Sequence, residues 1–141
     1  MTQKLIYNEF KKYFSGLAIT STICDNLGTT FSASSNLFIG TEPSNIGSCL
    51  TIIPYGGGPP SPKGDKREAA VQIRLRSKST EYGLKTQSAI IDALHDNTSI
   101  CASTHGRISA IQSEPILIGW QEAGEFNIIV SNYNIKYTKM N

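Results

Sequence analysis

The residues EAAVQIRLR, at positions 68–76, carry the clearest pattern in the chain. Apolar side chains occupy every second position, at Ala69, Val71, Ile73 and Leu75, and the positions between them are mostly polar. A period of two places successive side chains on opposite faces of an extended backbone. The stretch therefore predicts a β-strand that buries one face.

A helical period begins directly after this strand. Ser79 or Thr80 can cap a helix, and Glu81 suits the positive end of the helix dipole. One mostly apolar stripe then recurs at helical spacing, formed by Tyr82, Thr86, Ala89, Ile90, Ala93 and Leu94. The pattern predicts a helix of about four turns that ends near His95 and packs on the strand.

Three β-prone runs follow the helix. Arg107–Gln112 and Ile116–Gln121 are the first two, and a turn at 122–125 leads into the last. Apolar residues change faces along the last run: first Phe126, Ile128 and Val130, then Tyr133, Ile135 and Tyr137. Because a slip of one residue exchanges the faces of a strand, we expect a β-bulge near Ser131 or Asn132.

Upstream of the central strand, the sequence predicts one helix and two short strands. Thr2–Leu17 has apolar residues at helical spacing, and Asn36–Ile39 and Ser48–Ile53 are β-prone. Residues 18–35 are expected to be mostly loop. The order of elements predicts a single α+β domain over residues 1–141, with a mostly antiparallel or mixed sheet packed by the N-terminal helix and the central helix.

The segment Pro54–Lys66 holds four of the six prolines and four of the twelve glycines. Such a composition excludes a helix interior or a central strand, so we expect an exposed, irregular loop. Long loops without regular structure are often functional. This Gly/Pro-rich loop, residues 54–66, is the first candidate for contact with a partner.

The charge of the chain is small overall but unevenly distributed. The net charge is +2, yet residues 63–78 hold six cations against two carboxylates. No apolar run is long enough to span a membrane, and the N-terminal residues show no signal-peptide pattern, so we expect no membrane partner and use on the cytosolic side. Cys24, Cys49 and Cys101 are widely spaced and odd in number, which favours free thiols.

Sequence motifs for catalysis, cofactors or metals are lacking. Cys101, His105 and His95 could form a metal or Cys/His site, but a zinc site needs three to four ligands and no paired ligand motif supports one. Gly56–Gly58 is followed by prolines and does not match a phosphate-binding loop. We therefore expect no catalytic, cofactor or metal residues, and a protein that is not an enzyme.

Interface candidates come from the loop, the basic stretch and the aromatic residues. Arg74 and Arg76 project from the same face of the predicted strand, where they could meet phosphates, pair with a partner's carboxylates, or simply be solvated. Trp120 and Tyr133 are more typical of packing in a sheet. The candidate interface comprises Tyr55, Gly57, Lys63, Lys66, Arg67, Arg74, Arg76, Trp120 and Tyr133.

Several phrases of the sequence resemble the tail-terminator family of long-tailed phages, also described as minor capsid or tail-completion proteins. They are the strand VQIRLRSKS, the helix YGLKTQSAIIDALHD, the Ile-rich strand ISAIQSEPILIGWQE and the long final strand FNIIVSNYNIKYTK. The resemblance covers about residues 50 to 139. It lies in the order of elements and in these phrases, and not in a catalytic motif.

This resemblance implies a structural virion protein, assembled in the host cytoplasm. Such a protein caps the head-proximal end of the tail tube as a closed ring, typically a homohexamer, and helps join tail to head. Its partners would be further copies of itself, the tail tube protein and a neck or head-completion protein. DNA would pass through the channel without specific binding.

Two other interpretations remain open from the sequence. The chain could be a different neck or head-completion protein, which would differ in its neighbours and not in its chemistry. It could also be a small nucleic-acid-binding module that uses the basic stretch 63–78, and its affinity would then fall steeply with salt.

Overall fold

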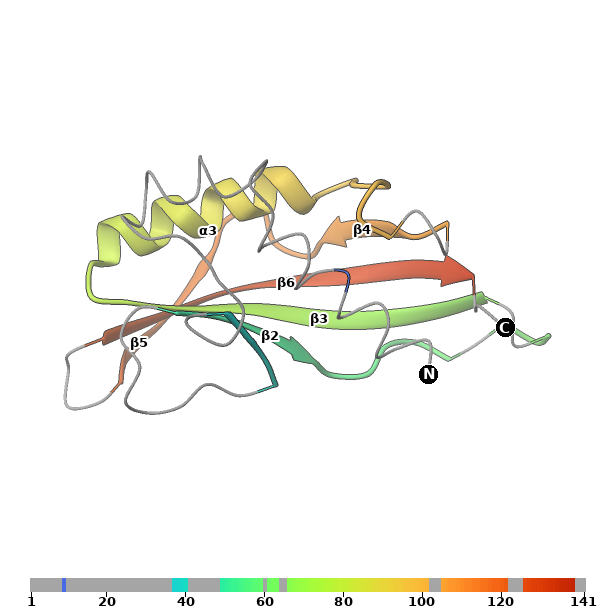
Figure 1. The fold of residues 1–141 in the computed structure, drawn as a ribbon, viewed down its shortest axis with the longest axis horizontal. Helices are drawn as coiled ribbons and strands as arrows, with labels where there is room; N and C mark the ends of the chain where they lie inside the picture. The colour runs from blue at the N-terminus through green and yellow to red at the C-terminus, as the bar shows by residue number, and fades with distance from the viewer. Residues whose placement is uncertain are drawn as a thin grey trace.

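The structure is a computed structural model, and it describes residue 9 and residues 37–40, 49–59, 61–63, 66–101, 105–121 and 126–138. Six strands and the helix α3 have defined bounds (Figure 1). In chain order they are β1 (Leu37–Ile39), β2 (Cys49–Pro54), β3 (Lys66–Ser77), α3 (Thr80–Leu94), β4 (Arg107–Ala110), β5 (Ile116–Gln121) and β6 (Phe126–Thr138).

All six strands belong to one mixed sheet whose centre is the pair β3 and β6. The strand order is β1-β2-β3-β6-β4, and β5 pairs with β6 as well. β1 is parallel to β2, whereas the other pairs are antiparallel. Since β3 occupies one edge of β6, β4 and β5 lie one after the other along its second edge. Helix α3 runs along one face of the sheet (Figure 1).

The pairing of β3 with β6 is long and regular. It extends from Lys66 opposite Thr138 to Ser77 opposite Asn127 without a shift in register. The expected bulge near Ser131 or Asn132 is therefore wrong, and the irregularity lies in β5, between Leu117 and Gly119.

Burial on both faces of β6 explains why no bulge is needed. Consecutive residues from Asn127 to Ser131 are all buried, so apolar side chains are accommodated on either face of this half of the strand. From Tyr133 onward the buried residues alternate, as they do in a strand with one covered face. The change of apolar face in the sequence therefore marks a change in coverage.

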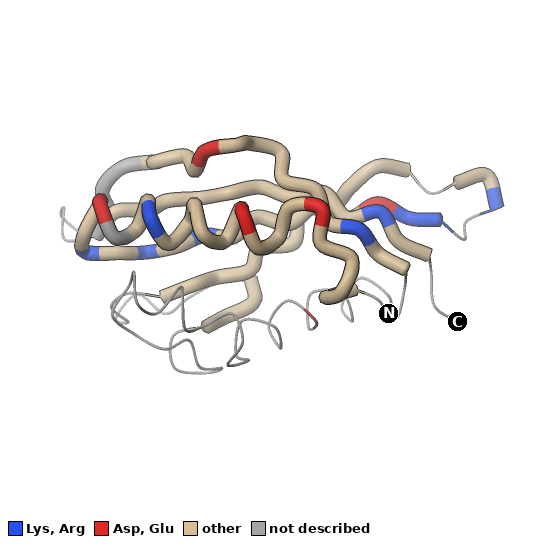
Figure 2. The backbone as a smooth tube through the Cα atoms, turned by 90° about the horizontal axis from the view of Figure 1, so that it is seen from above, with Lys and Arg blue, Asp and Glu red and all other residues tan. Residues whose placement is uncertain are grey.

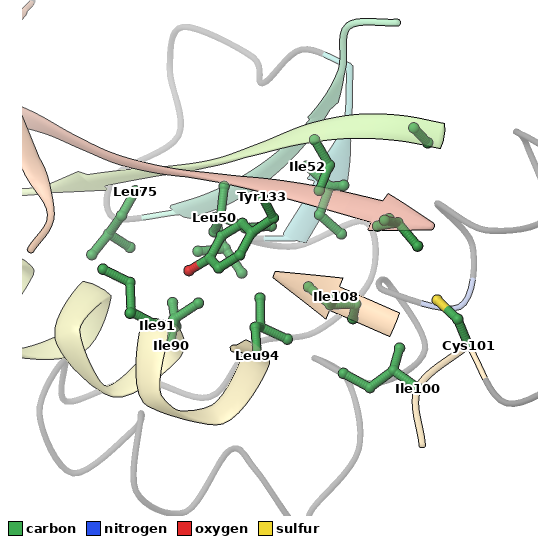
Figure 3. Close-up of a cluster of buried hydrophobic side chains, with 14 of the residues drawn as sticks. Leu50, Ile52, Leu75, Ile90, Ile91, Leu94, Ile100, Cys101, Ile108 and Tyr133 are labelled. Atoms are coloured by element: carbon green, nitrogen blue, oxygen red, sulfur yellow. The ribbon is translucent and has the colours of Figure 1, made fainter. Parts of the chain in front are cut away.

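The core lies between α3 and the sheet (Figure 3). Val71, Ile73 and Leu75 of β3 are fully buried, as are Ile90 and Leu94 of the helix. Burying each side chain of this size stabilises the fold by about 1.5–3 kcal/mol relative to leaving it exposed. The alternating apolar side chains of β3 and the apolar stripe of α3 thus pack together in one core, as the sequence predicts.

A buried polar network joins the helix to the two central strands. Gln87 is fully buried, and its Nε2 donates to the carbonyl oxygens of Ile73 and Ile129, each at 2.8 Å. Its Oε1 accepts from the Ser131 hydroxyl at 2.7 Å, and that hydroxyl oxygen accepts from Tyr133 at 2.8 Å. The network fixes the position of α3 over β3 and β6, because each buried polar atom that loses its partner is costly.

Close contact between α3 and the sheet also depends on a glycine. A Cβ at Gly83 would overlap the Cδ1 of Ile129 and crowd the side chain of Ser77. A larger residue in the first turns of α3 would therefore push the helix away from β6.

The predicted mixed, mostly antiparallel sheet with the central helix on one face is confirmed. The N-terminal helix expected over Thr2–Leu17 lies outside the described residues except for Glu9, which is helical. The packing of the sheet by two helices therefore stays a prediction.

Candidate interaction surfaces

Strand β5 forms an exposed edge of the sheet. Among the described residues it pairs only with β6, and Ile118 is skipped in the register. Ile116, Leu117 and Ile118 are 39%, 46% and 63% exposed, and the strand ILIGWQ carries no charge. Edge strands are usually protected by charges, proline or a covering segment, because an open edge pairs readily with another chain. The features of β5 are those of a contact surface.

A second exposed site, lined by both apolar and polar side chains, surrounds Tyr55 on the sheet face away from α3. Tyr55 is 50% exposed, and its hydroxyl donates to Oδ1 of Asn132 at 3.3 Å. The same oxygen accepts from Gln72 Nε2 at 3.1 Å, while Gln112 Oε1 accepts from the Asn132 backbone amide at 3.3 Å. These residues and exposed Ile111 border a pocket of about 350 Å³. The hydrogen bonds hold the ring of Tyr55 at its rim.

The Gly/Pro-rich loop is hydrogen-bonded to the sheet at both ends. The amide of Tyr55 donates to the Ala70 carbonyl at 3.1 Å, and the Ala70 amide donates to the carbonyl of Gly56 at 2.6 Å. At the other end, the amide of Ser61 donates to the Lys66 carbonyl at 3.0 Å, and the Lys66 amide donates to Ser61 Oγ at 3.2 Å. The described part of the loop therefore continues the β2–β3 hairpin.

Gly57 has a structural role in this loop. Its φ is +152°, and a Cβ there would overlap the carbonyl oxygen of Glu68. Only glycine fits so close to the backbone of β3. The local backbone geometry thus explains why position 57 is a glycine, and this explanation requires no contact with a partner.

Cations gather where β3 begins and β6 ends, the region near the C label in Figure 2. Lys66, Arg67 and Lys136 line a pocket of about 430 Å³ there, together with Glu68 and His105. Lys66 and Lys136 are exposed, as is Lys63 in the neighbouring loop. Pairing of β3 with β6 brings Lys136 to the basic stretch, a proximity that linear sequence does not reveal.

The predicted basic strip of Arg74 and Arg76 is largely covered. Both residues lie on the sheet face away from α3, but Arg76 is only 2% exposed. Both are engaged in interactions within the chain. Arg76 is therefore not a surface charge, which corrects the expectation of an open strip of two arginines. Sequence alternation predicts which face a side chain occupies, but not whether that face is covered.

The two aromatic candidates have different outcomes. Tyr133 is fully buried, its hydroxyl is in the Gln87 network, and burial raises its pKa strongly. Its side chain belongs to the core and is withdrawn from the candidate interface. The backbone of Trp120 lies in β5 opposite Asn127, and its side chain lies outside the described part of the structure.

The two histidines and the cysteine of the possible metal site have different surroundings. Nδ1 of His95 accepts a hydrogen bond from the Ala110 amide at 3.0 Å, while His105 is exposed at a turn. Cys101 is buried, and burial, with a smaller effect of the Glu9 charge, raises its pKa to about 11. Neither Cys49 nor Cys101 forms a disulfide, as predicted, and Cys24 lies outside the described ranges. No group of three potential metal ligands occurs within the described part.

Comparisons with known proteins identify a family for this chain and a solved structure with a similar fold. A family model described as bacteriophage tail terminator protein matches residues 17–139. Among solved structures, a chain from the virion of a native gene transfer agent particle is similar, with a TM-score of 0.56 and 12% sequence identity. The match covers 88% of this chain and 100% of that chain, and at this identity it shows a shared fold alone. No match is found among curated proteins. Within the described residues, no helix has the length and apolarity needed to cross a bilayer.

Proposed function

The chain belongs to the bacteriophage tail terminator family, and we propose on this premise that it caps the head-proximal end of the tail tube as a ring of identical subunits. Membership makes it a structural protein of the phage tail. The ring, of six copies, stops polymerisation of the tube and offers a docking surface for a neck or head-completion protein. It assembles in the host cytoplasm, and DNA passes through its channel without specific binding.

The observation that carries self-association is the open apolar edge at β5. Three consecutive large apolar residues, Ile116–Ile118, are exposed on a strand without charge. An edge of this kind favours uncontrolled pairing unless a partner covers it. A second copy of the chain provides such cover within a ring.

A closed ring requires that β5 of one copy contact a different surface of the next copy. Pairing β5 with β5 would give a two-fold dimer, whereas a heterologous, head-to-tail contact can close into a ring. Away from β5, the exposed large apolar residues among those described are Tyr55 and Ile111, at the rim of the 350 Å³ pocket. We therefore assign the contact to β5 of one subunit and the Tyr55 rim of its neighbour.

Substitution of Ile118 by lysine tests this contact. A lysine at the centre of an apolar interface would have to be desolvated, so Ile118→Lys should prevent ring formation while leaving the fold intact. The matched control is Thr98→Lys, which adds the same charge at an exposed position after α3. Light scattering over a concentration series gives the mass of each variant, and negative-stain images show whether rings form.

Two measurements distinguish the parts of the proposal. If Ile118→Lys forms the same oligomers as Thr98→Lys, β5 is not the ring interface. Capping is tested separately by adding the unmodified protein to polymerising tail tube protein, where it should shorten the tubes and decorate one end. Tubes of unchanged length without decorated ends would contradict the capping function even if rings form.

A further inference from the structure

The cationic pocket at the end of the sheet has a composition that neither the core nor the β5 contact explains. Its described lining residues include three cations, Lys66, Arg67 and Lys136, and one carboxylate, Glu68. Oε1 of Glu68 accepts a hydrogen bond from Nδ2 of Asn134 at 2.7 Å. The one carboxylate in this lining is thus held by the sheet, and the pocket keeps an excess of positive charge.

The backbone around this pocket holds its cations in place. Lys66 is bonded through both its amide and its carbonyl to Ser61, and it lies opposite Thr138 in the β3–β6 ladder. Lys136 lies in the same ladder, opposite Glu68. Because these positions are fixed before any ligand arrives, binding loses little entropy in ordering the backbone.

Shape and chemistry together indicate the class of ligand. The pocket is concave, has a volume of about 430 Å³, and includes Pro59 and Tyr137 beside the charges. Arg67 lies close enough to Tyr137 for its charge to oppose the rise in pKa that burial causes in that phenol. A segment that carries a carboxylate on an apolar stem would match both parts of the lining.

We propose that this pocket binds an acidic polypeptide segment of a partner protein, through charge-assisted hydrogen bonds from Lys66 and Lys136 to its carboxylates. A protein segment fits better than a DNA duplex, because duplex binding uses cations spread over a face that tracks the phosphates. Here the three cations of the pocket lining lie close together, where β3 begins and β6 ends. The inference does not depend on ring formation.

The test is the binding of a fluorescein-labelled hexaglutamate peptide to the full chain, measured by fluorescence anisotropy. Lys66→Glu combined with Lys136→Glu should weaken this binding by about tenfold or more, since it reverses the charge of the pocket. The matched control combines Lys78→Glu with Lys85→Glu, which makes the same change in net charge at two exposed lysines outside the pocket. The control should retain binding within about threefold. A second pocket variant, Lys66→Gln with Lys136→Gln, gives the same comparison without charge reversal, and urea unfolding verifies that each variant is folded.

A labelled oligothymidine of equal charge distinguishes the other class of partner. If it binds more tightly than hexaglutamate and loses affinity in the same pocket variants, the pocket is a nucleic-acid site and the proposal is wrong. Equal weakening by the pocket and control variants would also overturn it, because the binding would then follow net charge alone. Ring formation, measured on the same samples by light scattering, reports separately on the β5 contact.

Discussion

The face of the sheet under α3 and the edge at β5 carry similar apolar side chains, but these side chains differ in their exposure to solvent. Ile73, Ile129 and Ile135 are fully buried in the core, whereas Leu117 and Ile118 are 46% and 63% exposed. The covered regions also contain polar residues: Gln87 of α3 lies in the core, and Arg76 of β3 lies on the other face of the sheet. Hydrophobicity along the sequence therefore does not distinguish the buried face from the exposed edge in this chain; coverage by another element does.

The largest loss of stability is expected from a charge reversal in the covered part of the sheet. Arg76 is 2% exposed and engaged within the chain, so Arg76→Glu would place a negative charge where the fold accommodates a positive one. We expect the free energy of unfolding to fall by about 4 kcal/mol. Urea denaturation measures this change.

An exposed arginine provides the control for Arg76. Arg107 forms an ion pair with Asp96 at 2.6 Å, and both side chains are more than half exposed. Arg107→Glu should cost no more than about 1 kcal/mol, because surface pairs contribute little. If the two reversals cost the same, Arg76 is not held in a covered environment.

A smaller loss is expected on removing Gln87 from the helix–sheet interface. Gln87→Ala deletes three buried hydrogen bonds, to Ile73, Ile129 and Ser131, and should lower the free energy of unfolding by about 3 kcal/mol. Gln87→Met keeps most of the volume but not the hydrogen bonds, so it should recover only part of that loss. Full recovery with methionine would show that packing alone positions the helix.

The third prediction concerns stability at high pH. The Cys101 thiol has a pKa of about 11 in the folded chain, against 9.0 for its ordinary value. A raised folded pKa means that this stability is complete below pH 9.0 and is lost as the pH rises toward about 11, by a total of about 2–3 kcal/mol. Buried Tyr133, whose ordinary pKa is 10.0, acts in the same direction at still higher pH.

Urea midpoints on either side of pH 9 measure this effect, and Cys101→Ala isolates the contribution of the thiol. The variant will be less stable at every pH, but its midpoint should fall less steeply as the pH rises. Identical slopes in the two proteins would contradict the assignment to Cys101.

The smallest effect on stability is expected at the open edge. Ile118→Lys, which should abolish ring assembly, should change the free energy of unfolding by less than about 0.5 kcal/mol, because the side chain is already 63% exposed. A large destabilisation would mean that Ile118 belongs to the folded core, and the contrast between the two regions would fail.

Most of the sheet and its central helix could be predicted because local patterns determine them. The alternation at 68–76 and the stripe from Thr86 to Leu94 can each be recognised from residues that are adjacent in the sequence. Both coincide with elements of the structure. Gln87 was not predicted as a core residue, because a glutamine in an amphipathic helix is equally compatible with solvent. Its role arises from carbonyl groups of β3 and β6 that are distant in the sequence.

The candidate site was predicted less completely, for the same reason. Lys66 and Arg67 stood out in the basic stretch, but Lys136 joins them only through the register of β3 with β6. Arg76 and Tyr133 have residue types that occur at interfaces, yet both are buried. For β5, the one available signal was the lack of any charge in ILIGWQ, which a buried strand would share.

The central place of β3 also constrains the order in which the chain can fold. Its main partner, β6, is made only after α3, β4 and β5, so contacts such as Glu68 with Asn134 join residues 66 positions apart. Bringing such distant segments together carries a loop-closure cost that precedes any stabilisation by the ladder, and proteins rich in such contacts fold slowly. During synthesis, the β3–β6 ladder therefore cannot form until β6 has been made. Because β5 pairs with β6, its position at the margin of the sheet is also set only after that late closure.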